Sequence, residues 1–163
     1  MSVIVGGTNL ISSITGGVFL TGLADPDIGS ETSELEQAIY SAFMNNAILV
    51  AAAPGGLHNV QAQSGTSYPY VVFELPTGLK SNSFSHEKET VLIQFKIFTK
   101  TNSSVSLNEL RGNLINVFDN NLLILASYDT ISMRRTVSVK TKDELDEKVW
   151  IYMVSYRIEL EKK

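Results

Sequence analysis

Apolar residues recur at helical spacing in the first amphipathic segment of the chain. Five of them fall at positions i, i+3, i+4, i+7 and i+8: Leu35, Ala38, Ile39, Ala42 and Phe43. This spacing places them on one face of a helix. Ser33 and Glu36 have the spacing of a capping box, in which each side chain bonds the other residue's backbone N–H. The pattern predicts a helix over 33–46 with an apolar inner face.

The same reasoning predicts a second helix over about 105–119. Ser106 and Glu109 form another capping box at its start. Its apolar residues again share one face: Leu107, Leu110, Leu114, Val117 and Phe118. Both helices should therefore pack one side against a common core.

Strands are indicated by β-branched and aromatic residues and by alternating polarity. A short strand is expected within 57–63, and two longer ones over 70–75 and 89–100. The two longer strands should form a hairpin. Between them, 76–88 is predicted to be a polar loop, longer than a tight turn requires and suited to contacts with other molecules.

Two further strands are expected before the end of the chain. The first carries alternating apolar residues, Ile131, Met133, Val137 and Val139, and follows an apolar run at 122–126 that we expect to be buried against the sheet. The second, over 149–160, has apolar residues on both faces, which is typical of a sheet covered on both sides. The predicted fold class is α+β, with two helices packed on a mainly antiparallel sheet of four to five strands.

The first 24 residues contain no ionisable side chain, and glycine and hydroxyl residues interrupt their apolar positions. This pattern fits neither a secretory signal peptide nor a membrane-spanning helix, so we expect synthesis in the cytoplasm. We expect 1–30 to be an arm that docks on a neighbouring subunit, through residues such as Leu10, Ile14 and Phe19, and 31–163 to be a single α+β domain. A floppy terminus, or a strand that completes its own domain, remains an open alternative.

Composition narrows the function classes. The chain has 163 residues, of which 44% are hydrophobic and 18% charged, as expected for one globular domain. It has no cysteine and two histidines, which excludes disulfides, thiolate metal sites and a cysteine nucleophile. His58 and His86 lie apart in the sequence without a partner motif, and no phosphate-binding glycine motif is present. We therefore expect no enzymatic activity, no cofactor and no metal.

Charge is distributed unevenly along the chain. Residues 1–79 hold six acidic side chains and no Lys or Arg, a charge of -6, whereas 80–163 hold 11 acidic and 13 basic side chains, a charge of +2. No basic stripe of the kind that neutralises a phosphate backbone is visible. The pattern argues against sequence-specific binding of nucleic acid and leaves passive contact with DNA open.

Several features occur in a fixed order between residues 33 and 160. They are the opening helix with Leu35, Ala38, Ile39 and Phe43, the pair Gly55-Gly56 after a short apolar run, the strand start Tyr68-Pro69-Tyr70-Val71-Val72-Phe73, the alternating strand 91–98, the helix with Leu107, Leu110 and Leu114, and two final strands. In this arrangement the chain resembles the tail terminator and tail-completion proteins of long-tailed bacteriophages, also described as head-tail joining or minor tail proteins. The arm before the first helix is longer than that family's pattern.

The resemblance implies a structural virion protein that forms a ring, expected to be a hexamer, at the head-proximal end of the tail tube. Such a ring stops tail polymerisation and presents the surface for head-tail joining. Its implied partners are further copies of the chain, the tail tube protein and a head-completion or connector protein, with DNA passing through the lumen without sequence recognition and no membrane involved. Assembly would occur in the bacterial host cytoplasm. Another neck or tail-tube component, or a small cytoplasmic ligand-binding domain or enzyme, is the alternative.

Candidate interface residues outside the arm lie at two places. Leu79, Phe84 and His86 fall in the predicted 76–88 loop, where an exposed apolar side chain commonly marks an interface. Arg134 and Arg135 are adjacent on a predicted strand and so point to opposite faces. One should be exposed, and the other either paired at the edge of the core or in contact with a partner.

Overall fold

The computed structural model describes residues 30–82, 87–100, 105–119, 121–143, 146 and 148–163. The chain divides into two units, Met1–Glu31 and Thr32–Lys163. The fold described below is that of the second unit. Helix α3 begins two residues before this unit, at Ser30.

The described residues form three helices, α3 (Ser30–Met44), α4 (Ala47–Ala52) and α5 (Val105–Asp119). Both predicted helices are confirmed, and the short apolar run after the first helix forms a third. The Asn46 side chain caps α4, since its Oδ1 accepts a hydrogen bond from the Leu49 N–H at 2.9 Å.

The two predicted capping boxes are wrong in position. Helix α3 starts at Ser30 and α5 at Val105, so Ser33 and Ser106 both lie inside their helices. The Ser106 hydroxyl is buried and has no hydrogen-bond partner among the described residues. A capping-box spacing recurs by chance within helices, and the pattern therefore located each helix better than its first residue.

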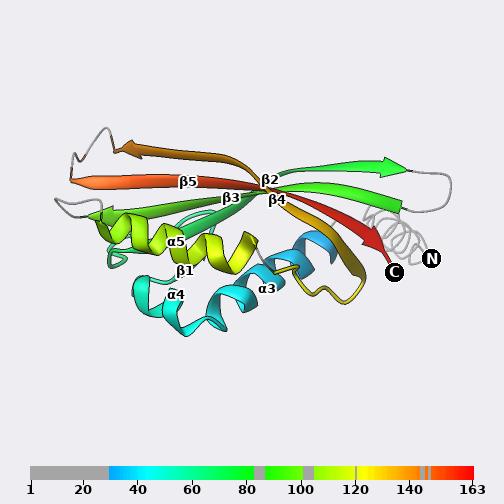
Figure 1. Ribbon diagram of the computed structural model, residues 1–163, viewed down its shortest axis with the longest axis horizontal. Coiled ribbons are helices and arrows are strands. Elements are labelled where there is room, and N and C mark those ends of the chain that lie inside the picture. Colours follow the sequence, from blue (N-terminus) through cyan, green and yellow to red (C-terminus); the bar gives the residue numbers. More distant parts are fainter. Residues whose placement is uncertain (1–29, 83–86, 101–104, 120, 144–145, 147) are drawn as a thin grey trace, which may run out of the picture. The chain divides into compact units, whose positions relative to one another are not determined.

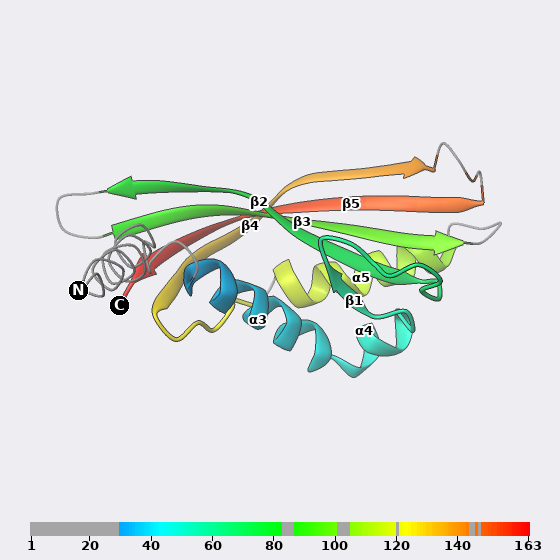
Figure 2. The same cartoon turned by 180° about the vertical axis from the view of Figure 1, so that it is seen from behind.

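Five strands form one mixed sheet in the described part of the chain. They are β1 (Leu57–Asn59), β2 (Tyr70–Asn82), β3 (Glu87–Lys100), β4 (Tyr128–Lys142) and β5 (Val149–Lys162), in the order β1-β2-β3-β5-β4. Strand β1 runs parallel to β2, and all other neighbours are antiparallel. All three helices lie on one face of this sheet (Figure 1 and, from behind, Figure 2). The predicted α+β class is confirmed.

The hairpin of β2 and β3 corrects the predicted loop at 76–88. Its ladder continues from Thr77 opposite Leu92 to Asn82 opposite Glu87, so most of the supposed loop is strand. The register shifts between Glu74 and Thr77, which accommodates Pro76 because a bulge tolerates a residue without an N–H. Residues 76–82 are mostly polar and show no alternation of apolar and polar side chains. The sequence pattern therefore did not indicate that their backbone pairs with β3.

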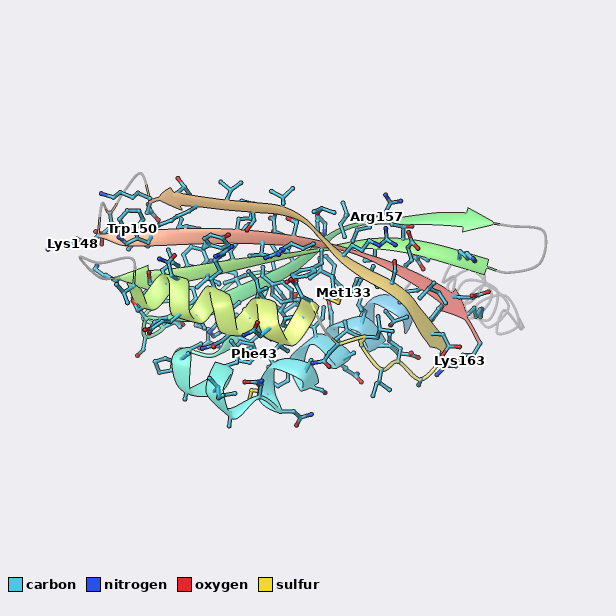
Figure 3. All side chains as sticks on the ribbon, in the orientation of Figure 1. Phe43, Met133, Lys148, Trp150, Arg157 and Lys163 are labelled. Carbon is cyan, nitrogen blue, oxygen red and sulfur yellow. The ribbon has the colours of Figure 1, made fainter. Side chains whose placement is uncertain are left out.

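The core lies between the helices and the inner face of the sheet. Its fully buried members come from all three described helices and from β2, β3 and β5. They include Leu35, Ile39, Phe43, Leu49, Leu107, Leu110, Leu114, Val71, Ile93, Phe95, Val154 and Tyr156. The centroid of the Phe95 ring lies 4.6 Å from the ring centroid of Phe118 in α5 and 6.0 Å from the ring centroid of Tyr156 in β5. Figure 3 shows Phe43 among the helices and Met133 on the helix side of the sheet.

The expectation that both faces of the sheet are covered is not met within the described residues. No described helix or strand lies on the face turned away from the helices, which we call the outer face (Figures 1 and 2). On β5, Tyr152, Val154 and Tyr156 are buried on the inner face, whereas Ile151 and Met153 on the outer face are only half-buried. Apolar residues on two faces of a strand thus do not imply a second helix layer from the same domain.

The apolar run 122–126 was expected to be buried, and only two of its five residues are. Leu123 and Leu125 are buried in the core. Leu122 and Ile124 point outward, 57% and 91% exposed. The run is extended between α5 and β4, and its side chains alternate between core and solvent for that reason.

Removing a core side chain should destabilise this domain strongly. Phe43→Ala or Leu114→Ala should each lower the free energy of unfolding by ~2–5 kcal/mol, because both side chains are fully buried and their removal leaves a cavity. Chemical denaturation measures the change. Met44→Ala is the matched control on α3, since Met44 is 46% exposed. A loss below ~1 kcal/mol for both core variants would place these side chains outside the core.

Candidate interaction surfaces

The structure describes only part of the candidate contact residues. Leu10, Ile14, Phe19, Phe84 and His86 lie outside the described residues. Leu79 lies in β2, where its backbone is paired with Thr90, and its side chain is outside the described set. Arg134 and Arg135 both lie on β4 and are described completely.

Arg135 points to the inner face and is paired there. Its Nη2 lies 3.3 Å from Oδ2 of Asp119, the last residue of α5, and the Tyr156 hydroxyl donates a hydrogen bond to Oδ1 at 2.7 Å. Burial, and secondly the bond to Asp119, raises the pKa of Tyr156, so its hydroxyl remains a donor over the physiological range. A carboxylate at the C-terminal end of a helix is unfavourable unless a cation offsets it. Arg135 therefore serves the fold, fastening the end of α5 to β4 and β5.

Arg134 points to the outer face, where it meets another arginine. Its partner in the register of β4 and β5 is Arg157, and both side chains are exposed. Figure 3 shows Arg157 on the side of the sheet away from the helices. Neither guanidinium has an ion-pair or hydrogen-bond partner among the described residues. Like charges directly opposite on neighbouring strands destabilise a sheet, so this pair is suited to an anionic group from outside the domain.

An apolar patch adjoins this pair on the outer face. It consists of Leu92, Val137, Val139, Ile151 and Met153, which we call the outer-face patch. Leu92, Val137 and Val139 are 36%, 45% and 48% exposed, and the other two are half-buried. The patch crosses β3, β5 and β4, three strands adjacent in the sheet. Exposed apolar residues gathered in this way mark interaction surfaces more often than singly scattered ones do.

The sheet also has two different open edges. Strand β4 is an edge strand: among the described residues it pairs with β5 and with no strand beyond it. At the other edge, β1 pairs only with Val71–Phe73, so the remainder of β2 is likewise uncovered by a described strand. Lys140 and Lys142 of β4 lie over the Trp150 ring at 4.6 and 4.9 Å from its centroid. Open strands bearing lysine resist indiscriminate pairing and remain available to a specific partner.

A groove of about 580 Å³ runs between α3 and residues 121–126. Glu34 is the charged residue in its lining, and both its carboxylate oxygens are occupied: Oε1 accepts from the Ser127 hydroxyl at 2.6 Å and Oε2 from the Ser127 N–H at 3.0 Å. These bonds lower the pKa of Glu34, the hydroxyl bond contributing most. With its carboxylate tied in this way, Glu34 fastens α3 to the segment before β4.

His58 has a structural role. Its Nε2 donates a hydrogen bond to the Gly55 carbonyl oxygen at 2.8 Å, and its ring meets that of Tyr70 edge-on at 6.0 Å. A Cβ at Gly55 would lie 1.9 Å from the Ser67 carbonyl oxygen, so this turn requires glycine. His58 and Gly55 together hold β1 against the start of β2.

Among the described residues, no three His, Asp or Glu side chains gather as ligands of a metal ion would. Within that same part of the chain, no helix is both long enough and apolar enough to cross a membrane.

Comparison with known proteins adds information on the fold. No family model and no curated protein sequence matches the chain. Its structure is similar to that of a chain in the virion of a native gene transfer agent particle, with a TM-score of 0.72 and 11% identity over 80% of this chain and 96% of that one. Bacteriophage SPP1 gp17 gives a TM-score of 0.49 and 14% identity over 77% of this chain and 89% of its own. The first likeness shows a shared fold over nearly the whole of the gene transfer agent chain.

The bonds of Glu34 predict a pH-dependent contribution to stability. Because its pKa is lower in the folded chain, ionised Glu34 stabilises the fold above the ordinary pKa of glutamate, and this contribution is lost as the pH falls through the folded-state pKa. Glu34→Gln should therefore lower the urea midpoint at neutral pH, and the gap to the unaltered protein should close on acidification. Glu36→Gln on the same helix is the control. A gap that stays constant over this pH range would contradict a role for the Glu34 charge.

Proposed function

We propose that this protein is a structural virion component that forms a ring at the head-proximal end of a phage tail tube, ends tube polymerisation and joins the tail to the head. The observation that carries the proposal is the fold shared with a chain of a gene transfer agent virion, which extends over 96% of that chain. The order of helices and strands that resembles the tail terminator family supports the same function.

The two open edges of the sheet support assembly into a ring. The edge formed by β4 and the edge formed by β1 and β2 are different surfaces on opposite sides of the sheet. A contact between two different surfaces is heterologous, and it repeats from copy to copy until a rotation closes it. We propose six copies, as in the family that the chain resembles, with DNA passing through the lumen without being read.

Capping by such a ring needs contact surfaces and no reacting group. One side of the ring would bind the last ring of tail tube protein, and the other would bind a head-completion or connector protein. We assign the joining contact to Leu79 of β2 and to Phe84, which follows β2 in the sequence. Polymerisation stops because the distal side of the ring offers no surface like that of the tube.

Complementation of a phage that lacks this gene tests the proposal. Replacing Leu79 and Phe84 by Ser should leave unjoined heads or overlong tails, because the joining surface is lost while β2 and β3 still pair. The matched control replaces both His58 and His86 by Asn, which should preserve tail length because no histidine chemistry is required. Tail lengths and joined particles are counted by electron microscopy, and circular dichroism confirms that each variant is folded.

Two outcomes would overturn the proposal. Loss of function from the histidine pair alone, in a folded protein, would favour a chemical role. Normal tails that carry a defect elsewhere in the particle would assign the protein to another neck or tail-tube position.

The arm before α3 is proposed to act in assembly. Deleting residues 1–28 should leave a folded domain, because the described core draws its buried residues from Leu35 onward. The truncated protein should give the circular dichroism spectrum of an α+β domain and form fewer oligomers in light scattering. If the truncated protein is unfolded, the arm is part of the hydrophobic core of its own domain and this proposal is wrong.

A further inference from the structure

We propose that the outer face of the sheet is the docking site for residues 1–24 of a second copy of this chain. The inference rests on the proposed ring, because the ring provides the neighbouring copy. It goes beyond the ring in naming both the surface and the segment that covers it.

The surface offers two chemically different zones in a fixed order. Along the outer face of β5, Ile151 and Met153 of the outer-face patch come first, Arg157 with its neighbour Arg134 comes next, and Glu159 follows. Leu92, the remaining member of the patch on β3, is the register partner of Arg157. Val139 and Val137 of β4 lie beside the apolar zone, since Val139 is the register partner of Met153 and Val137 that of Ser155. A segment that lies along β5 in its own direction therefore meets apolar side chains first and two cations afterwards.

The arm has the same two zones in the same order. Its first 24 residues carry no ionisable side chain, and Asp25 and Asp27 follow directly. An uncharged segment can cover the outer-face patch without burying an unpaired charge, which would be costly. The two aspartates can then pair with Arg134 and Arg157, which have no partner of opposite charge among the described residues.

The length of the arm is sufficient for this contact. Six residues separate Ile151 from Arg157, a distance of ~20 Å at ~3.3 Å per residue of strand. An extended segment of 24 residues spans up to ~80 Å, several times that distance. Residues such as Leu10, Ile14 and Phe19 can thus reach the outer-face patch while others bridge the gap between copies.

The occupant is a second copy because of where α3 begins. Helix α3 lies on the inner face of the sheet, and Asp27 is only three residues before its first residue, Ser30. Three residues span at most ~11 Å, which leaves little chain to pass round an edge of the sheet to the outer face of the same domain. Asp25 and Asp27 can reach Arg134 and Arg157 of a neighbouring copy without the chain passing round the sheet of its own domain.

Site-specific cross-linking of the purified full-length protein tests the docking, and the absence of native cysteine makes each introduced thiol unique. Leu10, Ile14 and Phe19 are changed to Cys one at a time in a tagged protein, and Val139→Cys is made in an untagged one. Mixing each pair with a flexible bismaleimide should give a tagged–untagged dimer for at least one arm position. Asn108→Cys, on the exposed side of α5, is the matched control and should give no such dimer.

Charge exchange tests the order of the two zones. Arg134→Glu with Arg157→Glu should abolish the cross-link, and adding Asp25→Arg with Asp27→Arg should restore it. Circular dichroism checks that each variant is folded. No dimer from any arm position, or no rescue by the second pair of substitutions, would overturn the proposal.

A further experiment distinguishes docking of the arm on a neighbouring copy from docking on its own domain. In protein that carries Ile14→Cys and Val139→Cys in one chain, a purely intramolecular cross-link would show that each arm covers its own domain and would overturn docking on a neighbour. Because these measurements use purified protein, they do not depend on phage complementation. Cross-linked dimers, together with normal, joined tails from the variant in which Leu79 and Phe84 are replaced by Ser, would leave the docking site intact and reject the terminator function.

Discussion

The packing of α5 on the centre of the sheet is the contact on which the rest of this structure depends. Leu107, Leu110 and Leu114 are fully buried, and Phe118 places its ring 4.6 Å from that of Phe95 and 6.2 Å from that of Tyr156. Each such side chain contributes about 1.5–3 kcal/mol when it leaves water. Because β3 and β5 are neighbours in the sheet but distant in sequence, one helix face holds together strands that local interactions could not.

Polar contacts connect the end of α5 and the first part of α3 to the strands or to the segment before β4. Asp119 joins α5 to β4 and β5 through Arg135 and Tyr156, and Glu34 joins α3 to the segment before β4 through Ser127. Asp119 forms an ion pair with Arg135 and accepts a hydrogen bond from Tyr156, and Glu34 accepts two hydrogen bonds from Ser127. Such bonds add modest stability but define the angle at which the apolar faces meet.

No described helix or strand covers the outer face of the sheet (Figures 1 and 2). Arg134 and Arg157 face each other there without a counter-ion among the described residues, beside the exposed Val137 and Val139. An anionic and apolar segment on this face would supply both burial and ion pairs.

The sequence by itself determined the helix faces, the alternation along β3 and β5, and the α+β class, because each follows from a period within one element. It also limited chemistry through the missing cysteines and the two histidines. Only the tertiary structure decided that 76–82 continues β2, that β1 runs parallel to it, and that Arg135 is paired with Asp119 while Arg134 meets Arg157. These features depend on strand register and on pairing between distant segments, which the local pattern of polar and apolar residues does not encode.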